Sequence, residues 1–555
     1  MSYLDLPRIN FTGRFFTNVS TINNTLANYD PSSPVGNPGW NPNGVALFKF
    51  DSCTVTGVQS ANDDGKLLGA AVTTPPQPVP GKLVDLDPDE QALSQIIGVV
   101  LNLSTASGSG FQGKLEPCNL QDMWRRAPQP SGNAGGSMAS ANFISTLNSV
   151  TWTNADQIEV LKQLCEATEN SQLAIRFCVS SYFFADPNDP TSGFGVLVGS
   201  IGPYRNGDPV QFARRRLAPH LLPQPAHDEF EANSPAKKKD PLPKLQFQAC
   251  NFQLDRTNYK LSIDLVNSIQ VASFAGPPRP VGKLRAVIVN EDGSTEETLE
   301  HPFEFTNETN KTHGGIVDVS LKPDQCTKLE KMRAGIELQQ PGGWTTILAE
   351  HASGKFVNIS PFTMRTVGGG DMNVELRAFQ WGQPLPNETL ELSAEATQGS
   401  PESLVINNGS GSATTNAEGK AAFVVNTPDT LTVPADRQQL DSLAYTFTGP
   451  WRALNGGLSS LQLAPAAIMV WAPYPDAPNP TWEGQVQPIF DEYMRIYPGM
   501  KQILDLTDLT VVLANKDALL SVFSLPFDAP HRMPVTRDLS EQKIEVIKTW
   551  LRSQP

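Results

Sequence analysis

The 555-residue sequence has only six cysteines and six histidines. No two cysteines form a CxxC pair, so neither a zinc knuckle nor a redox dithiol is indicated, and we expect free, mostly buried thiols in a reducing compartment. No two histidines stand at the spacing of metal ligands on one helix. The sequence motifs therefore predict no metal and no cofactor, and a metal site assembled from distant residues stays an open alternative.

Basic charge is also scarce, and long hydrophobic runs are absent. The chain has 42 Lys and Arg against 57 Asp and Glu, a net charge of -15. This balance disfavours a nucleic-acid partner, because binding to a phosphate backbone needs a basic face. No run approaches the roughly 18–20 apolar residues that span a bilayer, so we expect no membrane span. The first residues lack the basic stretch and apolar core of a secretory signal, so we expect a cytoplasmic protein.

Common catalytic motifs are missing as well. The sequence has no Walker A loop, no GxSxG elbow and no HExxH motif. Residues 108–113 spell GSGFQG, a literal GxGxxG, but Pro117 would break the helix that must begin there. No acidic residue follows about twenty positions later, as a dinucleotide site requires. We expect no such site, and the motifs leave open whether the protein is an enzyme.

Proline and glycine are plentiful, with 47 and 42 residues. They interrupt helices and mark turns, so we expect many short strands and long ordered loops. Segments 261–265 and 284–289 read as strands, and residues 290–294 (NEDGS) give a hairpin signal. The opening residues 8–12 also read as a strand, which ties the N-terminal end into the core.

Helical spacing appears mainly at the C-terminal end. Residues 487–497 and 501–513 are spaced as helices. In the last segment Asp538 and Glu541 resemble a capping box, ahead of an apolar stripe. The stripe consists of Ile544, Ile547 and Leu551. This pattern predicts a C-terminal helix that docks on the rest of the protein.

Together these patterns predict a mainly β (α+β) fold with one or two immunoglobulin-like β-sandwiches and a small C-terminal helical segment. A stretch rich in proline and charge provides the best linker. The predicted units are a β-rich N-terminal domain at 1–222, a linker at 223–244, a β-sandwich at 245–367, a second β module at 368–474 and the helical segment at 475–555.

His313 is the most suggestive single residue. It lies in THGGIVD (312–318), where two glycines precede a predicted strand. Such a turn can expose the imidazole at a loop tip, where a general base or a ligand could act. The simpler interpretation is a histidine that hydrogen-bonds a neighbouring loop, and both alternatives stay open.

Several phrases, in the same order along the chain, resemble the N-terminal half of the iminophenylpyruvate dimer synthases. These are the violacein-type and chromopyrrolate synthase enzymes of bisindole pigment biosynthesis. The phrases are LDLPRINFTG (4–13), LVDLDP (83–88), VGSIGPYRNG (198–207) with RRL (215–217), THGGIVD (312–318), LRAFQWG (376–382), Tyr493 with YPGM (497–500), and MPVTRDLS (533–540).

In that family the second half is a ferritin-like helical domain with metal-ligand carboxylates and histidines, and the oxidative coupling is attributed to it. The present sequence has no counterpart of that domain and no ExxH on a long helix. The resemblance therefore implies the architecture rather than the coupling activity. Matching motif positions nominate His313 and Asp318 as catalytic candidates, and Arg537 and Asp538 as binding candidates.

Three functions remain in competition. The first is a scaffold or accessory protein of secondary metabolism and biosynthesis that binds a small aromatic or amino-acid-derived molecule or docks a ferritin-like or oxidase partner. The second is a free-standing enzyme with a site between the β domains and His313 as base. The third is a carbohydrate- or surface-binding β-sandwich protein. A deep apolar pocket would favour an enzyme or a carrier over glycan binding.

Overall fold

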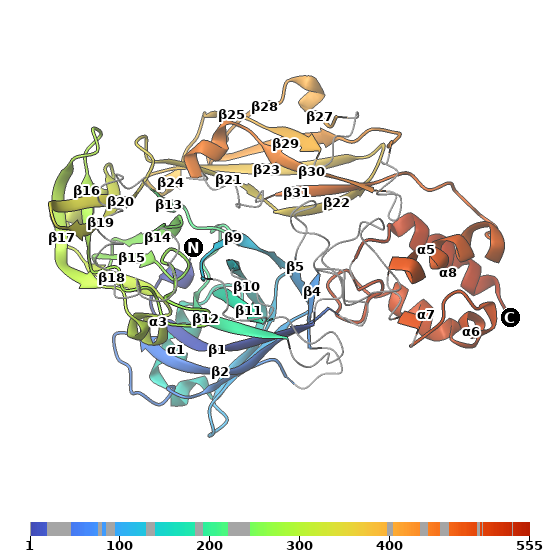
Figure 1. Cartoon of the computed structure of the whole chain (residues 1–555), viewed down its shortest axis with the longest axis horizontal. Coiled ribbons are helices and arrows are strands. Elements are labelled where there is room, and N and C mark those ends of the chain that lie inside the picture. Colours follow the sequence, from blue (N-terminus) through green and yellow to red (C-terminus); the bar gives the residue numbers. More distant parts are fainter. Residues whose placement is uncertain are drawn as a thin grey trace.

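The computed structural model describes residues 2–18, 46–75, 80–84, 95–128, 139–183, 193–219, 245–396, 403–432, 442–455, 466–496, 500–501, 503–535 and 537–555. The fold is mainly β with a small C-terminal helical segment, as the sequence predicts (Figure 1). The predicted linker at 223–244 lies outside the described residues.

The N-terminal part forms a closed sheet, in which β1 pairs with both β12 and β2 and completes a ring. Ile9 and Phe11 of β1 are fully buried in its core, which agrees with the predicted opening strand. In ring order the strands are β1 (Arg8–Asn18), β12 (Phe194–Pro203), β11 (Leu173–Phe183), β10 (Ala139–Thr153), β7 (Gly110–Leu115), β6 (Val100–Ser104), β3 (Ala71–Thr73) and β2 (Leu47–Gln59). Outside the ring lie β4 (Lys82–Val84), β5 (Gln95–Ile97), β8 (Cys118–Asn119), β9 (Gln121–Arg125) and the helix α1 (Glu159–Ala167).

A second, curled sheet follows, and apolar residues along its whole length share one core. Its first strand, β13, precedes the predicted linker and pairs with both β14 and β20. In order the strands are β17 (Thr295–Glu304), β16 (Lys283–Val289), β19 (Arg333–Gln340), β20 (Gly343–Ala349), β13 (Arg215–Pro219), β14 (Cys250–Asp255), β15 (Lys260–Asp264) and β18 (Ile316–Ser320). The predicted hairpin at 290–294 joins β16 to β17. Two helices accompany the sheet, α3 (Asn307–His313) and α4 (Pro323–Leu329).

The third part is a sandwich of two sheets around one core. One sheet holds β21 (Lys355–Ser360), β23 (Asp371–Gln380), β29 (Lys420–Asn426), β27 (Val405–Ile406) and β24 (Gln383–Pro384). The other holds β22 (Thr363–Val367), β31 (Ala467–Trp471), β30 (Ser442–Thr448) and β26 (Ser393–Ala396). A small ribbon pairs β25 (Thr389–Glu391) with β28 (Ser412–Thr414). The sandwich is established, and its immunoglobulin-like character stays a prediction.

The helical segment at the C-terminal end packs around a core of its own. It contains a π-helical turn (Trp482–Val486), α5 (Gln487–Ile496), α6 (Leu509–Ala514), α7 (Lys516–Phe523) and α8 (Glu541–Ser553). The predicted helix at 487–497 is confirmed by α5, and Ile544, Ile547 and Leu551 are buried as predicted.

Two details of the helix prediction are wrong. The helix predicted at 501–513 begins only at Leu509, because Asp505 and Asp508 hydrogen-bond nearby backbone N–H groups and hold a turn and a cap there. The predicted capping box is also absent. Ser540, not Asp538, caps α8, and its hydroxyl accepts from the Lys543 N–H at 3.3 Å.

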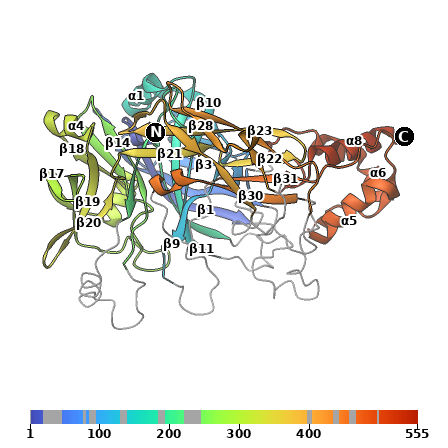
Figure 2. The same cartoon turned by 90° about the horizontal axis from the view of Figure 1, so that it is seen from above.

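The units are arranged with the sandwich over the closed sheet, the curled sheet at one end and the helical segment at the other (Figure 1). The turned view places the curled sheet and the helices at opposite ends as well (Figure 2). None of the helices in the described part of the chain has the length and hydropathy needed to cross a membrane.

The N-terminal end lies between the closed sheet and the curled sheet (Figure 1). Asp5, just before β1, is only 4% exposed, and its Oδ1 accepts from Gln253 Nε2 at 2.7 Å. Its Oδ2 forms an ion pair with the largely exposed Arg205 at 3.2 Å. Burial raises the pKa of Asp5 to about 6, and the Arg205 charge opposes that rise only in part.

We expect Asp5→Asn to stabilise the protein at pH 8 by roughly 1–2 kcal/mol. The folded pKa lies above the unfolded value, so the folded state binds more protons between about pH 4 and pH 6, and stability falls as the pH rises through that window. The advantage of the variant should therefore vanish near pH 4. Urea denaturation of both proteins at pH 4, 6 and 8 measures it, and an advantage that is the same at every pH would contradict this account.

Candidate functional site

A cleft with a volume of about 730 Å³ lies where the closed sheet, the sandwich and the C-terminal helical segment meet. Its lining comes from residues between 95 and 211, between 360 and 471, and between 527 and 544. Three segments far apart in the sequence thus build one concave surface, and such junctions between units are frequent locations of ligand sites.

The wall from the closed sheet and its extension is rich in side-chain amides, several of which are fixed by hydrogen bonds. Gln172 Nε2 donates to Asn148 Oδ1 at 2.9 Å, and Asn148 Nδ2 donates to Glu116 Oε2 at 2.7 Å. Gln211, which is 8% exposed, donates from Nε2 to the Pro117 carbonyl at 3.3 Å. The amides that line this wall are Gln95, Asn119, Asn148, Gln172 and Gln211. They offer a ligand hydrogen bonds but no catalytic nucleophile.

The sandwich wall carries Arg365 on β22 and Trp471 on the parallel neighbour β31. Because side chains alternate along a strand, Met364 enters the core and Arg365 points out of it. Arg365 Nη1 donates to Gln95 Oε1 at 2.7 Å, and the guanidinium lies over the Phe527 ring at 5.0 Å. Burial lowers the pKa of Arg365 to about 10, so the group stays cationic at neutral pH.

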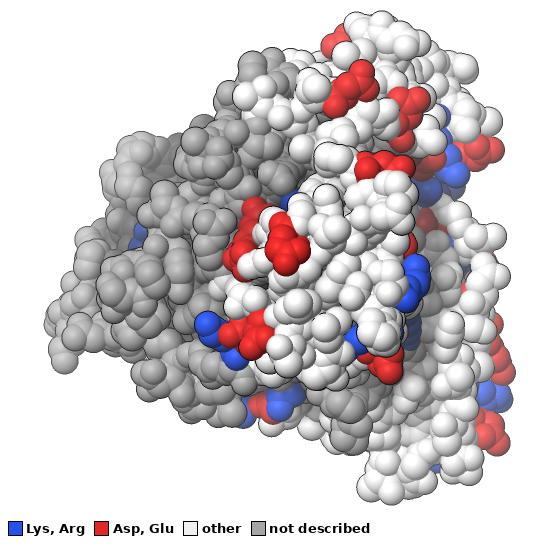
Figure 3. All heavy atoms as spheres, turned by 90° about the vertical axis from the view of Figure 1, so that its right-hand side faces the viewer, with Lys and Arg blue, Asp and Glu red and all other residues white. Residues whose placement is uncertain are grey.

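The helical wall adds two more arginines, both mostly buried. Arg532 Nη1 donates to the Leu525 carbonyl at 2.8 Å, and its Nη2 pairs with Glu541 at the start of α8. The Phe527 ring lies near two guanidinium groups, with that of Arg365 at 5.0 Å and that of Arg537 at 5.9 Å from the ring centroid. Among the described residues on the face seen in Figure 3, Asp and Glu side chains are scattered among separate Lys and Arg side chains. The cleft itself brings Arg365, Arg532 and Arg537 into one lining.

Arg537, a predicted binding residue, lines the cleft, and its guanidinium donates to backbone carbonyls of the preceding turn. Its Nη2 donates to the Ala529 carbonyl at 2.6 Å, and its Nε donates to that of Phe527 at 2.9 Å. Its Nη1 reaches three further carbonyls, those of Arg532, Pro534 and Val535. Burial, together with the charges of Arg532 and Arg365, lowers the pKa of Arg537 to about 9. These contacts order the turn that forms the helical wall.

Asp538, the second predicted binding residue, is 1% exposed and lies just behind the cleft lining. Its Oδ1 accepts from the Tyr493 hydroxyl at 3.1 Å, and its carbonyl accepts from Trp471 Nε1 at 2.7 Å. Asp538 thus joins the helical segment to the sandwich. It also supplies a negative charge that partly balances the Arg365 guanidinium.

His313, a predicted catalytic residue, is the last residue of α3 and is exposed to solvent. Its Nδ1 lies 3.2 Å from Gln59 Nε2 on β2. Partial desolvation and the nearby Arg8 charge lower the pKa of His313 from its usual value, against the opposing effect of Asp318. The ring therefore sits at the contact between α3 and the closed sheet.

Asp318, the other predicted catalytic residue, lies on β18 close to the same contact. Its Oδ2 accepts from Arg8 Nη2 at 2.6 Å, and its Oδ1 accepts from the Ser262 hydroxyl at 2.6 Å. The Arg8 side chain is fully buried. The segments 4–13 and 312–318 thus meet in space, and both carboxylate oxygens of Asp318 already have a partner.

The four predicted residues fall into two separate groups. Arg537 and Asp538 belong to the cleft region, whereas His313 and Asp318 lie at the junction of the closed and curled sheets and do not line it. Their functional roles stay predictions. Sequence reasoning missed Arg365, Trp471 and Phe527. The only signal at Arg365 is an alternating strand pattern, which does not say what covers its outer face.

The structure also shows where the GxGxxG segment and the cysteines lie. The GxGxxG segment runs into the strand β7 rather than into a helix. All six cysteines are free, and five are buried, as expected. The described residues contain no cluster of three or more His, Cys, Asp or Glu side chains placed to hold a metal ion.

Comparisons with known proteins leave the family open. No protein-family profile matches the sequence, and no curated protein matches it. Among solved structures, the native conformation of Escherichia coli alpha-2-macroglobulin is similar at 9% identity and a TM-score of 0.12. That alignment covers 99% of this chain and 36% of the other, so the chain spans about a third of the length of that protein. A similarity at this level supports no inference about fold or function.

Proposed function

We propose that this is a protein of specialised metabolism that binds a small aromatic or amino-acid-derived molecule in the cleft. The observation that best supports this proposal is the cleft itself. Its volume of about 730 Å³ falls within the range of roughly 300–1,000 Å³ typical of small-molecule sites. The kind of ligand follows from the resemblance to iminophenylpyruvate dimer synthases, which stays a hypothesis.

The composition of the walls supports such a ligand. Trp471 and Phe527 provide aromatic surface, and Val210, Leu539 and Ile544 add aliphatic surface. Amide side chains on the wall from the closed sheet and its extension supply donors and acceptors that can orient polar substituents. The lining thus combines aromatic and aliphatic surface with many polar and charged groups, a mixture that suits a ring with a polar tail.

The proposal predicts that some members of a defined ligand panel bind the full chain. The panel contains tryptophan, phenylalanine, their 2-oxo acids, their decarboxylated amines and indole. Binding is detected by saturation-transfer NMR and quantified by calorimetry. Val210→Trp should fill the cleft and weaken binding at least about tenfold, because the ligand loses most of its apolar contact.

Leu68→Trp is the matched control, because it places the same side chain on a residue that is 52% exposed and outside the cleft. It should leave binding unchanged, as should His313→Ala. If no panel member binds, or if Val210→Trp binds as well as the wild type, the proposed site is wrong. Binding that depends on His313 would instead favour an enzyme whose site lies between the β domains.

A further inference from the structure

One edge of the Arg365 guanidinium has no hydrogen-bond acceptor. Nη1 donates to Gln95 Oε1 at 2.7 Å, and one face of the group lies on Phe527. Nε and Nη2 are both buried and have no acceptor among the described residues. A buried donor without a partner costs about 1–3 kcal/mol and more when it is charged, so native proteins rarely retain one without a reason.

The unfilled edge has the geometry of a carboxylate receptor. The Nε–H and Nη2–H bonds of an arginine are parallel and donate to both oxygens of a carboxylate at once. Arg365 lines the cleft, and these two nitrogens have no acceptor among the described residues, so a carboxylate held in the cleft can supply the missing acceptors after a small shift of the guanidinium.

The other two arginines of the cleft lining already have acceptors, unlike the Nε–Nη2 edge of Arg365. Arg532 is engaged by Glu541 and the Leu525 carbonyl, and Arg537 by carbonyls of its own turn. The lining carries three arginines against two carboxylates, those of Glu116 and Glu541. Asp538 behind the wall acts on Arg365 through space, and no hydrogen bond links the two in the described residues.

A second unfilled group lies in the amide-rich wall. Gln211 Oε1 is buried and receives no donor in the part of the chain that the structure describes. Its orientation is fixed, because Nε2 of the same amide donates to the Pro117 carbonyl. The cleft lining thus offers a bidentate donor on the sandwich wall and an acceptor of fixed orientation on the amide-rich wall.

We propose that the cleft contains a carboxylate subsite formed by Arg365 Nε and Nη2, with Gln211 Oε1 accepting from an N–H or O–H group of the same ligand. This inference rests on the proposed function, because it names the polar groups of the ligand in that same cleft. A carboxylate fits better than a phosphate. Only one guanidinium edge is open, and a monoanion matches the small excess of positive charge, whereas a dianion would need more donors.

The test compares two probes that differ only in the anionic group, indole-3-propionate and the neutral indole-3-propanol, on the full chain by calorimetry. The wild type should bind the acid about tenfold more tightly than the alcohol, as expected for a charge-assisted pair. Arg365→Met should lower the affinity for the acid to that for the alcohol. Arg14→Met is the matched control, because Arg14 also lies over a phenylalanine ring, at 5.1 Å, but outside the cleft.

Two measurements without an aromatic ligand complete the test. Acetate should raise the melting temperature of the wild type above a sodium chloride control of equal ionic strength, and Arg365→Met should abolish that rise. Without any anion, Arg365→Met should melt within a few degrees of the wild type or higher, because it removes an unfilled buried cation. A large loss of stability would mean that Arg365 is structural and would overturn the subsite.

The outcomes separate the two proposals. Equal binding of acid and alcohol, weakened alike by Val210→Trp, overturns the subsite and leaves the binding function standing. An Arg365-dependent effect of acetate without binding of any aromatic probe supports the subsite and overturns the proposed function. Phosphate that stabilises the wild type through Arg365 more than acetate does would replace the carboxylate assignment.

Discussion

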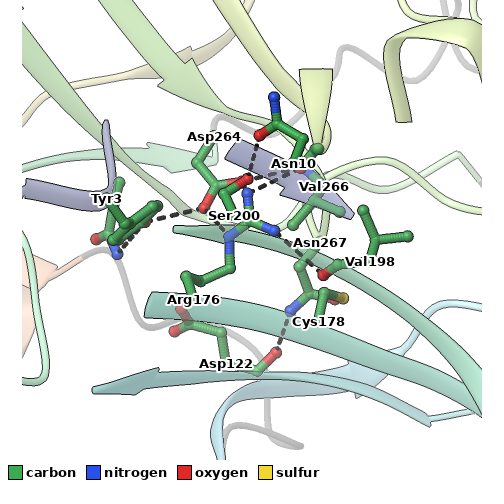
Figure 4. Close-up of polar contacts among 12 residues, drawn as sticks. Tyr3, Asn10, Asp122, Arg176, Cys178, Val198, Ser200, Asp264, Val266 and Asn267 are labelled. Carbon is green, nitrogen blue, oxygen red and sulfur yellow. Dashed lines mark hydrogen bonds and ion pairs between the residues drawn. The ribbon is translucent and has the colours of Figure 1, made fainter. Parts of the chain in front are cut away.

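Replacing Arg176 by methionine is expected to lower the free energy of unfolding by about 3–5 kcal/mol, the usual cost of leaving one charge of a buried pair without its partner. Arg176 on β11 is fully buried, and its Nε and Nη2 donate to the two oxygens of Asp264 at 2.9 and 3.0 Å (Figure 4). The same guanidinium donates to the Gly314 carbonyl at 2.8 Å and to that of Val198 at 3.3 Å.

This pair joins the closed sheet to the curled sheet, since Asp264 ends β15. The Tyr3 hydroxyl also donates to Asp264 Oδ2 at 2.9 Å, so the N-terminal turn belongs to the same network. Without the guanidinium, the carboxylate keeps Tyr3 but loses two charge-assisted bonds in a site that is only 3% exposed. Burial still disfavours the ionised carboxylate, and only the Tyr3 hydroxyl and the Val266 N–H are left to stabilise it.

The measurement is chemical denaturation followed by tryptophan fluorescence and circular dichroism, because a chain of several units can unfold in more than one step. Arg14→Met is the control. Its ion pair with Asp51 is half exposed, so its loss should cost no more than about 1 kcal/mol. The double variant Arg176→Met/Asp264→Leu should recover much of the loss, because no unpaired charge remains. A loss below about 1 kcal/mol for Arg176→Met would contradict the role of the pair.

The buried pair could be half predicted from the sequence. Arg176 interrupts the apolar run LAIRFCV (173–179), and Asp264 interrupts LSIDLV (261–266). A charged residue inside a buried strand needs a partner of opposite charge, so each of the two segments predicts a buried ion pair. Which charge meets which is a property of how two sheets pack, and spacing along one strand does not contain it.

The cleft could not be predicted from the sequence either, because it depends on how distant units pack together. Strand alternation places Arg365 outside the sandwich core, but only the docking of the C-terminal segment turns that outer face into a wall. By contrast, the mainly β class, the hairpin at 290–294 and α8 follow from local patterns, which need no knowledge of distant contacts. The segments 4–13 and 312–318 also meet, through Arg8 and Asp318, and this contact between distant segments is not contained in either local pattern.

Gly57→Ala is expected to destabilise the protein by about 2–4 kcal/mol through a steric conflict at that junction. Gly57 lies on β2, and a Cβ there would come 1.7 Å from the Thr312 carbonyl oxygen and 2.5 Å from its carbon. These are backbone atoms and cannot rotate away. The end of α3 would have to move off the closed sheet.

That movement would break identifiable hydrogen bonds. The Thr312 carbonyl accepts from Asn10 Nδ2 at 3.2 Å and from Gln59 Nε2 at 3.1 Å, and the neighbouring Lys311 carbonyl accepts from the Thr56 hydroxyl. Gly342→Ala is the matched control, since a Cβ at Gly342 meets no atom within 4 Å. It should change stability by less than about 0.5 kcal/mol.

A double-mutant cycle tests whether Gly57 and Arg176 support the same turn. Thr312 lies two residues before Gly314, whose carbonyl receives Arg176 Nη2, so displacement of the turn by Gly57→Ala already weakens what Arg176 stabilises. The double variant should therefore lose less stability than the sum of the two single losses, with a coupling of roughly 0.5–3 kcal/mol. Full additivity would show that the end of α3 does not transmit the contact from β2 to the buried ion pair, and that the two sheets are joined there by independent interactions.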